Sequence, residues 1–183
     1  MSSIETIADR CKNNDRQAQA ELYQLLAPKL LGVCVRYMQD RDEAEDVMQD
    51  AFVKIFTSIK SFKADGSFEG WARRITVNTA LSALKKRGRI LFERNLELVE
   101  NTEFSEEEEE LVDLDQVTAC INALAPGYRT IINLFLIEEF SHKEIAEKLS
   151  ISESTSRSQC ARARQALMKL LKEKLKPSVT KNA

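Results

Sequence analysis

A cluster of hydroxyl and guanidinium side chains late in this 183-residue chain has the chemistry to bind DNA. Serine and threonine hydroxyls hydrogen-bond to base edges and phosphate oxygens, and arginine binds guanine and phosphate. Four such residues fall within about one and a half helical turns, and we call them the base-contact residues: Ser154, Thr155, Arg157 and Ser158. Their types and spacing predict a surface that binds nucleic acid.

The segment from Ser141 to Leu171 predicts the helices that would present these side chains. Ser141 and Glu144 have the spacing of a capping box, which starts a first helix with a buried stripe of Ile145, Ala146 and Leu149. A turn at residues 150–152 follows, and Ser152 suits the N-cap of a second helix. This pattern is typical of a helix-turn-helix. An ordinary helical hairpin with a solvated basic face has the same pattern, so this segment alone leaves both interpretations open.

Charge is segregated along the chain, although the net charge is only −2. Seven basic residues and one acid lie between Arg73 and Arg94, and the same numbers lie between Ser154 and Lys176. Between them, residues 97–115 hold ten acids and no base. Two cationic patches on either side of an anionic spacer predict contact with phosphates at two places.

Residues that would support enzymatic chemistry are missing from the sequence. There is one histidine, His142, which we expect to be solvent-exposed, and no metal-ligand spacing, glycine-rich phosphate loop or nucleophile beside a base. We therefore expect no enzyme activity and no cofactor. The four cysteines are scattered, which favours reduced, buried thiols; an exposed, redox-sensitive Cys11 is the alternative.

Composition predicts a helical protein of the cytoplasm. The chain is 43% hydrophobic and 31% charged, with only five Gly and three Pro. No apolar run reaches 18 residues, and the N-terminal residues lack the apolar core of a signal peptide.

Apolar periodicity predicts helices at 18–37, 41–58, 71–86, 114–124 and 129–137, ahead of the helix-turn-helix. Pro28 is expected to kink or split the first, and Asp40 with Glu43 to form a capping box on the second. Residues 62–70 are expected to form a loop. The predicted fold class is all-α, with two small helical domains at 1–88 and 111–176, an acidic flexible linker at 89–110 and a disordered tail at 177–183.

Both halves resemble one protein family when they are taken together. The first half contains DEAEDVMQDAFVKIFTSIKSF and FEGWARRITVNTALSALKKR, which resemble regions 2.1 to 2.4 of sigma-70 factors of the extracytoplasmic-function (ECF) type. The second contains ALAPGYRTIINLFLIEEFSHKEIAEKLSISESTSRSQCARARQAL, which resembles their regions 4.1 and 4.2. The resemblance covers nearly all of residues 15–172. It implies a subunit that binds core RNA polymerase and promoter DNA, with an anti-sigma factor as a further possible partner. The alternative hypothesis is a stand-alone helix-turn-helix regulator.

The resemblance also implies a role for each basic and acidic surface. The helix of region 2.2 would dock on core polymerase through Asp42, Glu45, Asp46, Gln49, Asp50 and Phe52, where electrostatic complementarity supplies orientation and association rate. Without the resemblance, these residues would be interpreted as a solvated helix face. The −10 promoter element would be opened, with one base flipped into a pocket, by Ser61, Phe62, Lys63, Arg73, Arg74, Asn78, Thr79, Lys85, Lys86 and Arg87.

Some members of this −10 set have a second interpretation. Asn78 could fix the loop with a hydrogen bond instead of contacting DNA. Trp71, on the same helix, is expected to be a core anchor rather than a base contact.

The −35 element would be bound by the base-contact residues, with Lys143, Arg162 and Arg164 on phosphates. The aliphatic part of Arg162 could instead cover its own helix. Three positions depart from the family pattern: Ser150 and Ser154 stand where Gly is common, and Ala125 stands where Pro is usual. A serine in a left-handed turn costs about 1 kcal/mol, so we expect some strain in this turn.

Overall fold

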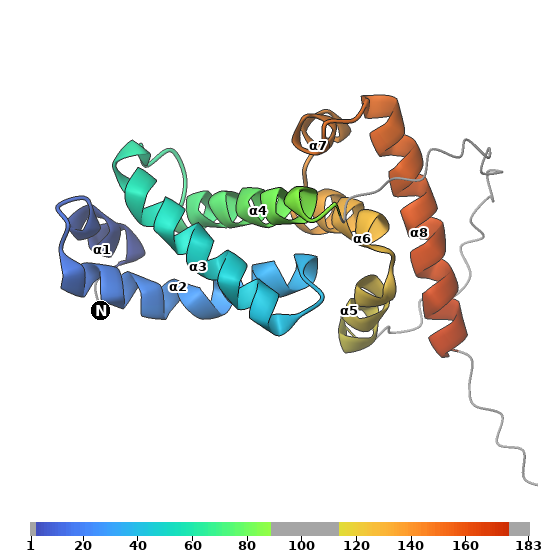
Figure 1. Cartoon of the computed structure of the whole chain (residues 1–183), viewed down its shortest axis with the longest axis horizontal. Helices are drawn as coiled ribbons and strands as arrows, with labels where there is room; N and C mark the ends of the chain where they lie inside the picture. The colour runs from blue at the N-terminus through green and yellow to red at the C-terminus, as the bar shows by residue number, and fades with distance from the viewer. Residues whose placement is uncertain (1–2, 89–113, 176–183) are drawn as a thin grey trace, which may run out of the picture. The chain divides into compact units, whose positions relative to one another are not determined.

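The structure is a computed structural model that describes residues 3–88 and 114–175, and every regular element in these ranges is helical (Figure 1). The chain divides into two compact units, with the boundary between residues 89 and 90. The predicted linker at 89–110 and tail at 177–183 lie outside the described residues. The all-α fold class is confirmed for the described ranges.

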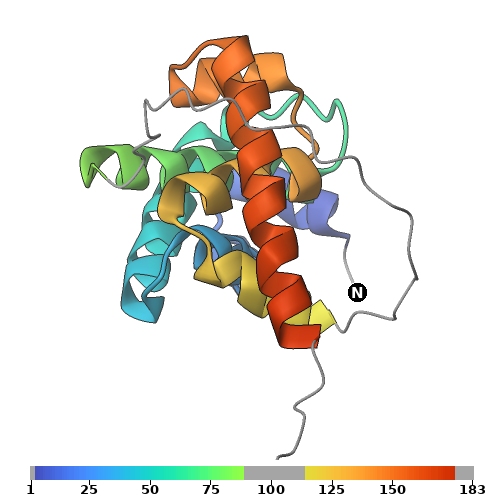
Figure 2. The ribbon, with the colours of Figure 1, turned by 90° about the vertical axis from the view of Figure 1, so that its right-hand side faces the viewer.

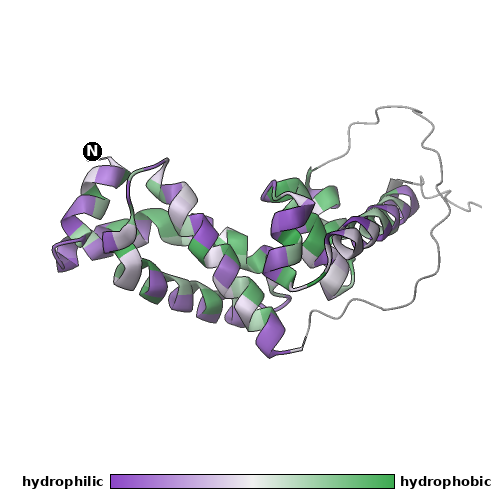
Figure 3. Cartoon of the chain, turned by 90° about the horizontal axis from the view of Figure 1, so that it is seen from above, coloured by the Kyte–Doolittle hydropathy of each residue, from purple (hydrophilic) through white to green (hydrophobic). Residues whose placement is uncertain are grey.

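The first unit packs four α-helices around one apolar core. They are α1 (Ile4–Cys11), α2 (Arg16–Tyr37), α3 (Arg41–Ser58) and α4 (Phe68–Lys86), and the short 3-10 helix η1 (Ile59–Ser61) follows α3. Helices α2, α3 and α4 pack against one another, and α1 packs on α2 and α4. Apolar and polar residues alternate along these helices in Figure 3, as expected of helices with one buried face. The largest fully buried side chains of this unit are Tyr37, Phe68, Ile7, Leu22, Leu26, Leu30, Ile55 and Leu84.

Side-chain caps fix where the long helices of the first unit begin. Asp15 accepts hydrogen bonds from the N–H groups of Gln17 and Ala18, and Asp40 accepts from those of Asp42 and Glu43. The N-cap half of the capping box predicted for Asp40 and Glu43 is therefore confirmed. Helix α2 continues through Pro28 without splitting, because Leu26 and Leu30 on either side of it are buried in the core.

The second unit is built around the long helix α8 (Glu153–Leu175), which crosses the others in Figure 2. Helices α5 (Leu114–Ala123), α6 (Pro126–Ile132) and α7 (His142–Leu149) all pack against it. The predicted helix at 129–137 instead ends as α6 and continues as the π-helix η2 (Asn133–Ile137). Leu114, the first residue of the helix predicted at 114–124, begins α5 and is 80% exposed.

All four cysteines are buried and free, which confirms the prediction and rejects an exposed Cys11. Burial raises the pKa of the Cys34 thiol to about 12, and it also raises the pKa of Cys11 and of Cys160. In the ranges 3–88 and 114–175, no helix is long and apolar enough to cross a membrane.

Candidate nucleic-acid interface

The helix-turn-helix predicted from residue 141 onward is present, with the predicted caps. The Ser141 N–H donates to Glu144 Oε2 at 2.9 Å and the Glu144 N–H donates to Ser141 Oγ at 3.3 Å, which closes the capping box. The predicted stripe of Ile145, Ala146 and Leu149 is buried. Ser150 ends α7 with φ +58°, the left-handed conformation in which a Cβ is unfavourable. The turn between the two helices is therefore strained, as the sequence predicts.

The base-contact residues lie in the first turns of α8, where their polar groups are bonded within the helix. The Ser152 hydroxyl accepts from the Thr155 N–H at 3.0 Å, which confirms the predicted N-cap. The hydroxyls of Ser154 and Thr155 lie 2.8 Å and 2.7 Å from the same Ser152 oxygen. Ser158 donates to the Thr155 carbonyl, and the Arg157 guanidinium pairs with the Glu153 carboxylate. Each base-contact residue therefore already makes a hydrogen bond or ion pair within its own helix.

The phosphate-contact candidates of this unit differ in their surroundings. Lys143 and Arg164 are exposed, and Arg162 is half-buried, as expected if its aliphatic part covers the helix. The Arg164 guanidinium also lies over the Phe135 ring, 4.9 Å from its centroid. This contact orients Arg164 while leaving it open to solvent.

His142 is not the solvent-exposed side chain that the sequence analysis expects. Its ring stacks on Phe135 with centroids 4.6 Å apart and planes at 14°, and its Nδ1 lies 3.0 Å from Ser156 Oγ. Burial lowers the pKa of His142, and the charges of Arg157 and Arg164 lower it further, against the opposing effect of Glu153. The prediction was wrong because the preceding π-helix, which brings Phe135 beside His142, gives no recognisable signal in the sequence.

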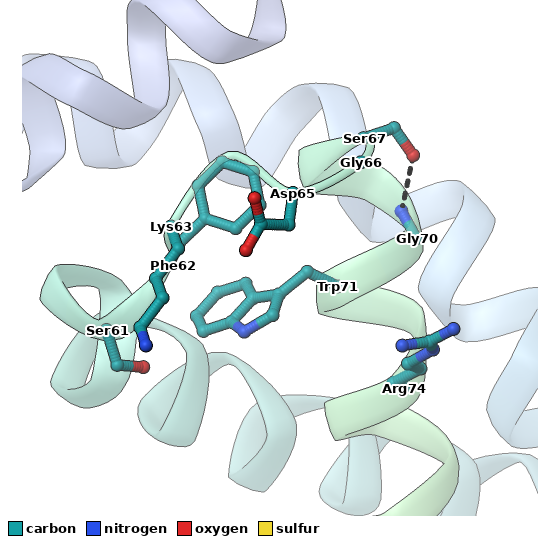
Figure 4. Close-up of a pocket in the computed structure, with 9 residues that line it drawn as sticks. All are labelled: Ser61, Phe62, Lys63, Asp65, Gly66, Ser67, Gly70, Trp71 and Arg74. Carbon is teal, nitrogen blue, oxygen red and sulfur yellow. Dashed lines mark hydrogen bonds between the residues drawn. The ribbon is translucent and has the colours of Figure 1, made fainter.

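A pocket of about 370 Å³ opens between the end of α3 and the start of α4 (Figure 4). The side chain of Ser67 caps α4 by accepting from the Gly70 N–H at 3.1 Å, and Gly66 takes φ +105°, which only glycine adopts without strain. The pocket contains a carboxylate, two cations and an indole ring, a mixture that can stack and hydrogen-bond a nucleobase. It is lined by Ser61, Phe62, Lys63, Asp65, Gly66, Ser67, Gly70, Trp71 and Arg74, and we call it the loop pocket.

An aromatic cluster forms the floor of the loop pocket. The Trp71 ring lies 5.6 Å from that of Phe62 and 5.3 Å from that of Phe68. Phe68 is fully buried, whereas Trp71 is half-buried and points into the pocket in Figure 4. Trp71 therefore packs in the aromatic cluster, as expected of a core residue, and also lines the loop pocket. Phe62, predicted to bind DNA, is just 8% exposed, and Lys12 of α1 lies over its ring, 5.7 Å from the centroid.

Helix α4 presents most of the predicted −10 residues on its surface. Arg74, Asn78, Lys85, Lys86 and Arg87 are exposed and Arg73 is half-exposed. Thr79 is the exception: it is 4% exposed, its hydroxyl donates to the Ile75 carbonyl, and Lys54 Nζ lies 3.2 Å from it. Thr79 faces α3 rather than solvent, because its position on the helix puts it beside buried Thr76 and Ala80. Its inclusion in the predicted site was therefore wrong.

The acidic part of α3 is exposed as predicted, except for its aromatic member. Asp42, Asp46, Gln49 and Asp50 are exposed, and Glu45 is half-buried with Arg41 Nε 3.0 Å from its carboxylate. We call these five residues the acidic face. Phe52 is only 3% exposed and packs on Tyr23 at 4.5 Å and on Phe56 at 5.9 Å between ring centroids. Phe52 therefore supports the acidic face from within the fold.

Several residues at these surfaces were missed by the sequence analysis. Asp65 lines the loop pocket, Glu153 pairs with Arg157, and Ser156 contacts His142. Asp65 belongs to a loop recognisable from its two glycines, but a loop prediction does not say which of its side chains line a pocket. The other two lie in a helix whose buried face could not be assigned without its neighbours.

Comparison with known proteins decides the family of the chain. A sequence model of Sigma-70 region 2 matches residues 22–90, and one of Sigma-70 region 4 matches residues 114–167. The chain belongs to the sigma-70 family. It is an ECF sigma factor, a non-catalytic protein that directs RNA polymerase to specific promoters for the initiation of transcription.

Curated relatives match this ECF sigma factor along most of their length. The RNA polymerase sigma-H factor of Pseudomonas aeruginosa is 31% identical over 93% of this chain and 94% of the relative. The ECF RNA polymerase sigma factor SigW of Bacillus subtilis is 30% identical over 88% and 93%. A stand-alone helix-turn-helix regulator would not account for the match to region 2, so that alternative is not supported.

Solved structures agree on the fold. The sigma factor RpoE from Bartonella quintana, in complex with the anti-sigma factor NepR, is 26% identical with a TM-score of 0.52, and the match covers 84% of this chain and 96% of that one. CnrH, in complex with the cytosolic domain of CnrY, has a TM-score of 0.50 at 21% identity over 92% and 96%.

Proposed function

We propose that the ECF sigma factor divides promoter recognition between its two units, with residues 1–88 opening the −10 element and residues 111–176 anchoring the −35 element. The loop pocket carries the proposal, because it combines a half-buried indole with hydrogen-bonding and cationic groups at one opening. One non-template base would be flipped into it, stacking on Trp71. Opening costs a few kcal/mol per unstacked step, and base–aromatic stacking offsets part of that cost.

The exposed cations of α4 supply the sequence-independent contacts of this mechanism. Arg74 lies at the pocket, while Lys85 and Lys86 follow at the far end of the same helix. Their spacing suits contacts to the DNA backbone from the flipped base toward the spacer. Phe62 acts by supporting the pocket, and Thr79 is left out of the proposed contact surface because it is buried.

The acidic face of α3 is the proposed docking site for core RNA polymerase. Asp42, Asp46 and Asp50 recur along one side of the helix, so a basic partner surface could contact all three. Complementary charge of this kind favours correct orientation and rapid association.

The proposed setting is the cytoplasm, where core polymerase and promoter DNA are found. An anti-sigma factor that covers these same surfaces is a further proposed partner, supported by the complex of the similar sigma factor RpoE with the anti-sigma factor NepR.

In vitro transcription tests the proposal as a whole. Core enzyme is added to a library of genomic promoter fragments with and without the ECF sigma factor. We expect transcripts from a defined set of promoters only when the protein is present. Absence of protein-dependent initiation across the library would refute the proposal.

Open-complex formation tests the loop pocket itself. Permanganate footprinting of the −10 element should show less opening with Arg74→Ala, and a promoter with a premelted −10 element should restore much of the loss. Lys60→Ala is the matched control, because Lys60 is an exposed cation of η1 outside the pocket lining. Equal opening with both variants would count against the pocket.

A further inference from the structure

Three elements of the second unit meet at His142, the first residue of α7. Its imidazole stacks on Phe135 of η2, and its Nδ1 lies 3.0 Å from the hydroxyl of Ser156 in α8. Ser156 is fully buried and His142 is half-buried, so this hydrogen bond is partly shielded from water. Hydrogen bonds depend on direction as well as distance, and they are stronger where water is excluded.

Ser156 stands in the middle of the base-contact residues. Thr155 and Arg157 are its neighbours in sequence, and Ser154 and Ser158 lie two residues away on either side. A side chain that holds Ser156 in one direction therefore sets the directions of all four, because successive helical residues are related by a fixed rotation. The apolar contacts of Ile145 and Leu149 bury the helix but tolerate small rotations better than a hydrogen bond does.

We propose that His142 is a positioning residue for −35 recognition: its stack on Phe135 and its hydrogen bond to Ser156 fix the rotation of α8 about its axis. This inference rests on the proposed role of α8 at the −35 element. In this role His142 acts through Phe135 and Ser156, and it needs no base contact of its own. The residue thus affects which bases are preferred through the direction of the base-contact residues.

Three variants separate the stack from the hydrogen bond. His142→Phe keeps an aromatic ring on Phe135 and removes the hydrogen bond. His142→Asn keeps a hydrogen-bonding group near the place of Nδ1 and removes the stack. Ser156→Ala removes the partner hydroxyl with little change in volume.

Holoenzyme is assembled from core polymerase and each variant, and its affinity is measured for its best promoter and for the same promoter with single −35 substitutions. The discrimination ratio is the first affinity divided by the second. We expect His142→Phe and Ser156→Ala to lower the ratio about tenfold, the size of one well-placed base contact. Affinity for the fully substituted −35 promoter should stay unchanged. His142→Asn should retain most of the ratio, because it keeps the directional hydrogen bond and loses only the less directional stack. The double variant His142→Phe with Ser156→Ala should be no worse than either single variant.

The outcomes distinguish this inference from the proposal on which it rests. If wild-type holoenzyme shows no penalty for any −35 substitution, both fail. If wild type discriminates and Ser156→Ala discriminates equally well, the positioning role alone is overturned. Equal losses on every promoter sequence would also overturn it, because they would reflect folding rather than helix rotation. Should His142→Phe fail to fold, comparison of Ser156→Ala with His142→Asn still decides.

Discussion

The guanidinium of Arg87 lies 2.8 Å from the carboxylate of Glu43, so the basic end of α4 is paired with the acidic start of α3. The two side chains are 36% and 23% exposed. An ion pair at this depth is worth roughly 1 kcal/mol or less, which a phosphate can readily replace. The predicted contact of Arg87 with DNA would therefore compete with this ion pair.

Glu43→Gln should release Arg87 and add about one phosphate contact. For the holoenzyme, the slope of the logarithm of promoter affinity against the logarithm of salt concentration should become more negative by roughly 0.9. Filter binding between 50 and 300 mM salt measures this slope. Glu21→Gln is the matched control, since it removes the same charge beside Arg10, which has no proposed DNA contact. Identical slopes for the two variants would contradict the prediction.

Reversing charge on the acidic face should abolish docking on core polymerase. Asp46→Lys combined with Asp50→Lys places two cations on an exposed part of α3, where the helix itself has no need of the carboxylates. Circular dichroism should stay unchanged while core binding, measured by native gel or fluorescence anisotropy, falls by at least a hundredfold. The control is Glu147→Lys with Glu173→Lys, which changes net charge equally on exposed residues of the other unit. Unaltered affinity of the Asp46/Asp50 variant would disprove the docking site.

Ser150→Gly should stabilise the second unit. The left-handed conformation costs serine about 1 kcal/mol, and the larger entropy of glycine in the unfolded chain offsets part of the gain, leaving about 0.5 kcal/mol. Ser150→Ala retains the Cβ and should give no gain. Amide hydrogen exchange of α7 and α8 reports on this unit, where slower exchange in the glycine variant alone is expected.

Acidification should destabilise the second unit through His142. Burial lowers its pKa below the usual 6.5, with Arg157 and Arg164 adding to the effect and Glu153 opposing it. The unfolded chain then binds the proton more readily than the folded one. Stability is fully present above pH 6.5 and falls as the pH drops from there through the lowered pKa of the folded state.

Hydrogen exchange of α7 and α8 between pH 5 and 8, corrected for intrinsic rates, measures this loss. His142→Asn has no imidazole to titrate and should lose less stability over the same interval. Parallel profiles for the two proteins would assign the acid sensitivity to other groups.

Local signals explain why the helix-turn-helix could be predicted in detail. Ser141 and Glu144 form a capping box from contacts three residues apart, and Ser152 caps α8 in the same way. Such contacts depend only on the neighbouring sequence. The family resemblance supplied the expectation that these contacts do not give, namely which of the basic helices would bind which part of the promoter.

Errors in the predicted site have a shared physical origin. Thr79 and Phe52 lie on the right helices but face inward, because the width of the buried stripe depends on the helices packed against it. His142 was misplaced because a π-helix shifts the residues that follow it relative to an α-helix. Avoiding these errors requires knowing which helices pack against one another. A single sequence does not give those contacts.

The bonded state of the base-contact residues has a consequence for how the protein finds its target. Ser154, Thr155 and Arg157 arrive at DNA with their polar heads already engaged by Ser152 and Glu153. If these residues bind bases as proposed, exchanging those bonds brings no gain over unrelated DNA, so we expect phosphate attraction alone to hold the complex there and to let it slide. Only at a matching sequence would new hydrogen bonds to bases offset the loss of the bonds within the helix. We expect the dwell time at the correct site, rather than the rate of arrival, to mark the promoter.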